Sequence, residues 1–111
     1  MIILYTIILL ISAALPLSAA VRCRTGVYSG LAEDGAVSFR GIRYALPPLG
    51  ERRFAPPEPV PASNASFEAV RFGDASPQPA PTPNRQSEDC LWLNVCADMC
   101  PGRKDRPVMA F

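Results

Sequence analysis

The most regular apolar pattern in the chain lies near its C-terminal end. From Leu91 to Val95, bulky apolar residues alternate with Trp92 and Asn94, directly after the run Ser-Glu-Asp-Cys. Strict alternation over this length is typical of a β-strand. The pattern predicts a strand that buries Leu91, Leu93 and Val95 and turns Asn94 outward.

The first part of the chain predicts a small antiparallel meander. Residues 21–30 indicate two short strands around a turn at Gly26, with Val27 facing inward. A polar loop over residues 31–35 closes with an Asp-Gly turn pair, and residues 36–39 then resume an extended pattern.

Prolines determine the structure of the next stretch. Five prolines between residues 41 and 59 remove backbone donors and fix φ, which excludes a helix. Apolar side chains that a linker would lack favour an ordered loop, with a flexible linker as the alternative. These side chains are Ile42, Tyr44, Leu46, Leu49 and Phe54.

A second proline-rich stretch, residues 76–84, alternates proline with other residues. The composition predicts an extended polyproline II loop on the surface. A docking ligand for a proline-reading domain is the alternative.

Residues 1–20 have the features of a secretory leader. They carry no charged side chain, are apolar from residue 2 to 11, and end in Ser-Ala-Ala, which suits signal peptidase. We expect a signal peptide of residues 1–20 and a mature part of residues 21–111. A membrane anchor is the alternative, although the interrupted apolar run falls short of the ~20 residues that a bilayer requires.

Charge and length limit the partners of the mature part. The chain of 111 residues has 11 basic and 10 acidic side chains, a net charge of +1 and no basic cluster. This balance argues against nucleic acid as a partner. A piece this short buries only about 60% of its unfolded surface, so it needs disulfides or a larger body to pack on.

Four cysteines are available for disulfides: Cys23, Cys90, Cys96 and Cys100. If Cys90 and Cys96 belong to one strand, they start about 20 Å apart at ~3.3 Å per residue, which is too far for a disulfide. We predict that Cys96 pairs with Cys100 and that Cys90 pairs with Cys23.

The same cysteines are poor candidates for chemistry. The chain contains no histidine and no paired C-x-x-C, so we expect no metal site. A thiol nucleophile would also lack a histidine to act as its base. We expect no cofactor.

Asn64 begins the triplet Asn-Ala-Ser, which is an acceptor for N-glycosylation. Occupancy requires a secreted chain and a surface position. Asn64 is therefore a candidate glycosylation site.

Six landmarks follow one another along the chain. They are Gly26 with Gly30, the run F-R-G-I-R-Y-A-L-P-P-L-G at residues 39–50, Arg53-Phe54 with Pro57 and Pro59, Phe72-Gly73, Pro77-Gln78, and S-E-D-C-L-W-L-N-V at residues 87–95. In this order they resemble the N-terminal part of the type B carboxylesterase and cholinesterase-like family of α/β-hydrolases. The resemblance covers nearly all of the chain after the leader.

The resemblance implies an α/β fold, a mixed and mostly parallel sheet with helices on both faces. Residues 21–111 would supply the antiparallel N-terminal strands and the proline-rich loops of that domain. Within this segment we expect mostly strand and coil, with at most a short helical turn.

Three positions depart from the family pattern. Arg43 stands where the family has proline, and Trp92 where it usually has tyrosine. Ser76 stands where the family has the cysteine that usually bonds to the one at Cys90. Cys90 is therefore either free or bonded to another cysteine.

The resemblance also implies the chemistry. The family hydrolyses esters with a serine that a histidine activates, an acid that orients the histidine, and an oxyanion hole. The oxyanion loop, the G-x-S-x-G elbow and the triad would all follow Phe111, so we expect no catalytic residue in this chain. Arg53 and Glu88 match a buried ion pair of the family that ties the proline loop to the strand start, and two solvent-exposed charges are the alternative.

We therefore expect the N-terminal part of a secreted carboxylesterase-like serine hydrolase that acts on small-molecule carboxylic esters. One alternative is a relative without catalysis that serves as an extracellular adhesion or recognition domain. Another is a short secreted, disulfide-bonded binding module, although the apolar residues 108–111 would then leave an exposed strand edge.

Overall fold

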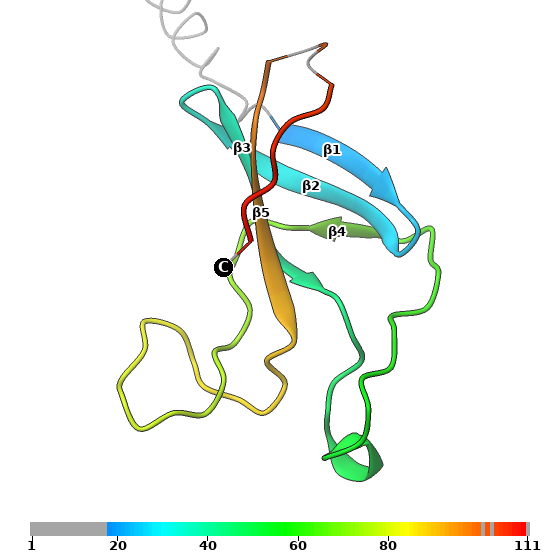
Figure 1. The fold of residues 1–111 in the computed structure, drawn as a ribbon, viewed down its shortest axis with the longest axis vertical. Helices are drawn as coiled ribbons and strands as arrows, with labels where there is room; N and C mark the ends of the chain where they lie inside the picture. Colours follow the sequence, from blue (N-terminus) through cyan, green and yellow to red (C-terminus); the bar gives the residue numbers. More distant parts are fainter. Residues whose placement is uncertain (1–17, 101, 103, 111) are drawn as a thin grey trace, which may run out of the picture.

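The computed structural model describes residues 18–100, 102 and 104–110 (Figure 1). Its elements are β1 (Ser18–Cys23), β2 (Gly26–Glu33), β3 (Ala36–Arg43), the 3-10 turn η1 (Gly50–Arg52), β4 (Ser66–Glu68) and β5 (Trp92–Asp98). The strands form one sheet in the order β1-β2-β3-β5, with β4 beside β2. The prediction of a segment of strand and coil with one short helical turn is confirmed. No helix among the described residues is long and apolar enough to cross a membrane.

Most of the predicted leader, residues 1–17, lies outside the described residues. Its last three residues, 18–20, form the first half of β1 and pair with residues 29–31 of β2. Cleavage after Ala20 would therefore leave β1 with residues 21–23 alone.

β1, β2 and β3 form the antiparallel meander that the sequence predicts. The second hairpin turns at Asp34 and Gly35, whose φ angles of 50° and 76° match the type I′ turn of two-residue hairpins. The first turn falls at residues 24–25 rather than at Gly26, and β2 runs on through residues predicted as loop. The two turns, at residues 24–25 and 34–35, have only two residues each. All residues between them, including residues 31–33 that were predicted as loop, therefore belong to β2.

The first turn also determines which face of β2 meets the core. Tyr28 is buried and Val27 only half-buried, so the prediction that Val27 faces inward is wrong. Side chains alternate along a strand, and a shift of one residue exchanges the two faces. The Tyr28 ring stacks on Phe67 with the ring centroids 5.3 Å apart. The core cluster consists of Tyr28, Val37, Phe39 and Ala69.

β2 and β3 separate beyond their hairpin, and the segment with β4 fills the fork between them (Figure 1). Val27–Ser29 of β2 pair in parallel with β4. Ala69 N–H donates to Ser29 O, and Ala69 O accepts from Arg40 N–H of β3, both at 2.8 Å. Residues 65–70 therefore join both strands across the fork.

A bulge in β3 changes the face to which its last residues point. The register shifts between Phe39 and Ile42, so two residues of β3 lie opposite Asn94 alone. One of them, Gly41, has a φ of 72°, and its N–H donates to Asn94 Oδ1 at 2.9 Å. Asn94 thus pairs a backbone donor that the bulge takes out of the ladder. Ile42 returns to the core, and Arg43 turns to the opposite face.

β5 confirms the predicted strand but not its predicted burial. Leu93 and Val95 lie opposite Ile42 and Phe39, on the core face of the sheet. They are nevertheless 38% and 43% exposed, and Phe67 on the same face is 44% exposed. We call Phe67, Leu93 and Val95 the open core face.

Two proline-rich loops extend away from the sheet (Figure 1). The loop over residues 44–59 contains η1 and is closed by a bridge between Ala45 and Pro59, in keeping with an ordered loop. Three of the five predicted anchors, Tyr44, Leu49 and Phe54, are 50%, 44% and 96% exposed, so that part of the prediction is wrong. The loop over residues 76–85 lies on the surface and joins the body at the bridge between Ala75 and Gln86.

Candidate functional site at the start of β5

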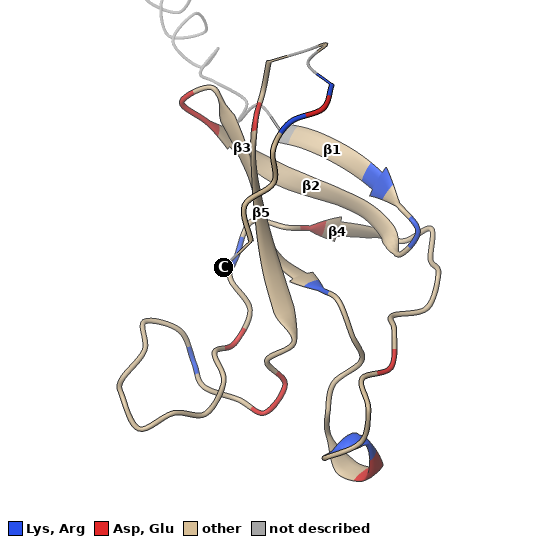
Figure 2. Ribbon diagram, in the orientation of Figure 1, with Lys and Arg blue, Asp and Glu red and all other residues tan. Residues whose placement is uncertain are grey.

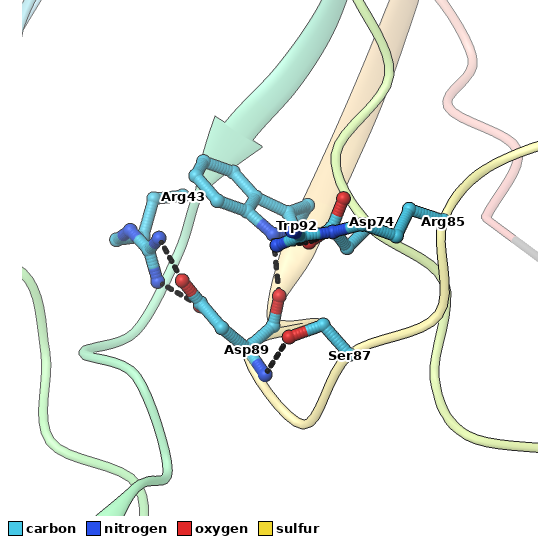
Figure 3. Close-up of polar contacts among 6 residues, drawn as sticks. All are labelled: Arg43, Asp74, Arg85, Ser87, Asp89 and Trp92. Carbon is cyan, nitrogen blue, oxygen red and sulfur yellow. Dashed lines mark hydrogen bonds and ion pairs between the residues drawn. The ribbon is translucent and has the colours of Figure 1, made fainter.

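Three polar or aromatic side chains meet where the end of β3 lies against the start of β5 (Figure 3). Arg43 is the last residue of β3 and pairs across the ladder with Trp92, the first residue of β5. Asp89 lies in the turn that leads into β5. We call Arg43, Asp89 and Trp92 the clamp.

The clamp is held by charge-assisted and aromatic contacts. Arg43 Nη1 and Nη2 donate to Asp89 Oδ1 and Oδ2 at 2.6 and 2.9 Å, a bidentate pair. The Arg43 guanidinium also lies 3.9 Å from the centroid of the Trp92 ring. Trp92 Nε1–H donates to Asp89 O at 3.0 Å. Each of the three residues therefore contacts the other two.

Gly73 brings a third segment against the clamp. A Cβ atom at this position would lie 2.2 Å from Trp92 Cγ, so the backbone of residues 72–74 passes directly against the indole. Gly73 therefore packs against the indole ring, and the Arg43 guanidinium stacks on it. The clamp joins β3, β5 and the connection between them.

The turn before β5 has further polar contacts around the clamp. Asp89 N–H donates to Ser87 Oγ at 3.1 Å. Arg85 donates twice to Asp74 Oδ2, at 3.1 and 2.8 Å, which closes the base of the loop over residues 76–85 (Figure 3).

Electrostatics favour the charged form of the clamp. The hydrogen bonds from Arg43 lower the pKa of Asp89 against the opposing effect of burial, and the charges of Arg43 and Arg85 lower it further. The two paired side chains are 22% and 29% exposed, so solvent screens their pairing only in part. Elsewhere, the charged residues of both signs are spread over turns, loops and strand ends (Figure 2).

The arrangement positions segments and offers no reacting group. The chain has no histidine, and the described residues contain no cluster of three or more Cys, Asp or Glu side chains that could hold a metal ion. The carboxylate of Asp89 is already engaged by a guanidinium. The clamp can fix the entry of β5 relative to β3, and that is the role its contacts support.

The four cysteines are free thiols in the structure, and neither predicted disulfide is formed. Two strands, β2 and β3, lie between Cys23 on β1 and the strand that Cys90 precedes. The hydrogen bond with Thr25 lowers the pKa of the Cys23 thiol, whereas Asp98 raises the pKa of Cys100. The pairing stays a prediction, which peptide mapping of the purified protein would test.

The predicted pair of Arg53 and Glu88 has its charged atoms 2.8 Å apart, Nη2 to Oε1. The two side chains are 55% and 47% exposed, so the expectation of a buried pair is wrong. The pair is exposed because nothing covers this part of the proline-rich loop among the described residues. The neighbouring Phe54 is exposed as well.

Sequence reasoning missed the clamp although the signal was available. Arg43 and Trp92 are two of the three positions at which the chain departs from the family pattern, and they contact each other. Arg43 was predicted to lie in the proline-rich loop rather than in a strand, so only the shared departure from the family pattern linked it to Trp92.

We predict strong coupling between Arg43 and Asp89. Arg43→Gln and Asp89→Asn should each lower the free energy of unfolding by about 1.5–3 kcal/mol, because each leaves a partly buried charge without its partner. The double variant should lose less than the sum, as measured by urea unfolding. Purely additive losses would contradict a direct interaction.

The same pair predicts an acid-dependent stability. Because the folded-state pKa of Asp89 is lowered, its contribution is complete above the unfolded-state pKa, near pH 4, and is lost as the pH falls through the folded-state pKa. The stability difference between the wild type and Asp89→Asn should be constant from pH 5 to 7 and shrink in more acidic buffer. A difference that grows on acidification would refute the assignment.

A much weaker coupling is expected for Arg53 and Glu88. Exposed pairs contribute at most about 1 kcal/mol, so reversing both charges should restore only a small part of what one reversal costs. Adding 0.5 M salt should reduce this coupling further. Coupling as strong as that of Arg43 with Asp89 would show that the pair is buried in solution.

Comparison with known proteins identifies sequences and structures that are similar to this chain. The model of the carboxylesterase family matches residues 18–111. The para-nitrobenzyl esterase of Bacillus subtilis (strain 168) is 38% identical over 98 residues, which cover 82% of this chain and 20% of that protein. The acetylcholinesterase of Bungarus fasciatus is 39% identical over 108 residues, with 82% and 18% covered.

Solved structures agree with these relatives. A solved PNB esterase has a TM-score of 0.68 and 40% identity, covering 74% of this chain and 17% of its own. A carboxylesterase of Geobacillus stearothermophilus has a TM-score of 0.63 and 42% identity, covering 69% of this chain and 16% of its own.

One sequence relative is not named as an esterase. Rat thyroglobulin is 44% identical over 69 residues, which cover 60% of this chain and 2% of that protein. The chain thus spans about a fifth of the length of the esterases it matches.

Proposed function

Because the chain belongs to the carboxylesterase family, we propose that it is the N-terminal part of a secreted serine hydrolase for small-molecule carboxylic esters. Its own residues supply structure to that enzyme and none of its reacting groups. Ester hydrolysis by a serine and histidine needs residues that these 111 do not contain, since there is no histidine among them.

The observation that carries this proposal is the open core face. Leu93 and Val95 continue the row of core residues but are 38% and 43% exposed, and Phe67 is 44% exposed. Beside them, β5 is the last strand of the sheet order and pairs only with β3 among the described strands. An apolar sheet face next to an unpaired edge is stable in water only when something covers it. Further strands and helices of the same domain would provide that cover.

Secretion is the second part of the proposal. Residues 1–20 have the composition of a leader, and cleavage after Ala20 would begin the mature chain at Val21. N-terminal sequencing of the protein from culture medium should find Val21 first. A chain that stays with the membrane and keeps residue 1 would support the anchor alternative instead.

The test of the hydrolase function needs the longer gene product. A longer chain that includes the family's elbow serine and histidine should hydrolyse p-nitrophenyl esters. Residues 21–111 alone should not. The matched control is the extended product with the elbow serine changed to alanine. A folded extended product that has both residues and no activity on any ester would overturn the proposal.

We keep a domain without catalysis as the alternative function, and thyroglobulin is an example of a similar segment in a protein without an esterase name. In this alternative the domain serves extracellular adhesion or recognition, and the extended product lacks the serine or the histidine. Sequencing the transcript past the codon for Phe111 separates the two functions before any assay. A stop codon there, with soluble secreted protein, would support the short binding module.

A further inference from the structure

The structure displays the Asn64 triplet in a way that the sequence alone does not show. Asn64 and Ser66 are both exposed, and Asn64 lies in the connection just before β4. Its side-chain amide makes no hydrogen bond among the described residues, unlike Asn94, whose amide oxygen accepts from Gly41. The group that would be modified is therefore free and faces solvent.

The backbone around the triplet is fixed on both sides. Ser63 N–H donates to Arg24 O at 3.0 Å, and Val27 N–H donates to Ala65 O at 2.9 Å. The Arg24 guanidinium also donates to Val60 O at 2.9 Å. The triplet is thus hydrogen-bonded to the turn between β1 and β2 and to the start of β2, while Asn64 and Ser66 remain exposed.

We infer that Asn64 carries an N-linked oligosaccharide, placed at the turn end of the outer strand β1. This inference rests on the secretory route in the proposed function. In the transfer, the Asn64 amide nitrogen forms a bond to C1 of the sugar. The C1–O bond to a lipid-linked pyrophosphate breaks, the pyrophosphate leaves with the electron pair, and the amide proton passes to a base of the transferase.

The position leaves the β5 part of the open core face clear, whereas Phe67 of that face lies on β4, three residues from Asn64. In the order β1-β2-β3-β5, the turn between β1 and β2 lies across the sheet from β5. A bulky glycan at Asn64 therefore leaves β5 and its apolar row accessible to the rest of the domain. It adds bulk beside β1, an outer strand whose Val21 is 51% exposed.

The test is translation of the full chain in the presence of microsomes, with residues 1–20 replaced by a proven cleavable leader. The protease-protected chain should show one mobility shift that glycosidase removes. Asn64→Gln and Ser66→Ala should abolish the shift, and Ser66→Thr should keep it. Asn84→Gln is the matched control, because Asn84 is exposed but lies outside a triplet, and it should keep the shift.

A protected chain without the shift, or a shift that persists in Asn64→Gln, would overturn the inference. The replaced leader keeps this outcome separate from the proposed secretion, which the native leader tests. The microsome assay requires neither folding nor ester hydrolysis. Loss of the glycan and loss of the hydrolase function are therefore distinguishable.

Discussion

Replacing Gly41 with alanine will unfold much of the protein under conditions in which Gly35→Ala remains folded. Both glycines have a left-handed backbone, with φ of 72° and 76°, so alanine adds about 1–2 kcal/mol of strain at either position. They differ in the space available. A Cβ at Gly41 would lie 2.4 Å from Arg71 O, whereas a Cβ at Gly35 would meet nothing within 4 Å.

The contact at Gly41 is with backbone, which cannot rotate away as a side chain does. Arg71 also follows the segment that fills the fork, so moving it disturbs the pairing of Arg40 with Val70. We expect Gly41→Ala to cost about 1–3 kcal/mol more than Gly35→Ala in urea unfolding. Equal losses for the two variants would show that the bulge adapts and that the close approach is unimportant.

The second large effect is expected at Gly73. A Cβ there would lie 2.2 and 2.4 Å from Trp92 Cγ and Cδ1, so Gly73→Ala must displace the indole. The displaced ring would give up its hydrogen bond to Asp89 O and its contact with Arg43. We expect a loss of about 3 kcal/mol, at the upper end for an overpacked site, because these contacts are lost as well.

Trp92 reports on this change directly, since it is the sole tryptophan of the chain. Its emission should shift to longer wavelength in Gly73→Ala while the variant is still folded by circular dichroism. The control is the same glycine substitution in a Trp92→Ala background, where the added methyl group has room and should cost little. A penalty of the same size in both backgrounds would mean that the indole is not the obstacle.

The sequence predicted those parts of the fold that have strong local causes. The alternation around Leu93 located β5, and the Asp34-Gly35 pair located a hairpin turn, because both signals lie within a few neighbouring residues. The phase of β2 was missed, because the first turn came at residues 24–25 and exchanged the faces of Val27 and Tyr28. β4 has three residues, which is too short for a period to be visible.

The bulge and the clamp needed the structure for a different reason. Gly41 and Asn94 are far apart in the sequence, and only the register of β3 against β5 shows that one supplies the hydrogen-bond acceptor for the other. The same register brings Arg43 to Trp92. The burial of Leu93 and Val95 was overestimated because strand periodicity identifies a face, whereas burial depends on what lies against that face.

The fork between β2 and β3 has a consequence for the order of folding. The two hairpins of the meander join neighbours in sequence and can close in microseconds. The segment over residues 65–70 and β5 arrive only after long loops have closed, and such non-local pairing is slow. Until residues 65–70 arrive, the diverging halves of β2 and β3 carry unpaired backbone groups that match an extended segment. Residues 65–70 of a second unfolded chain can pair with the same backbone groups. We therefore expect misassembly to occur by exchange of this segment between two chains at the fork.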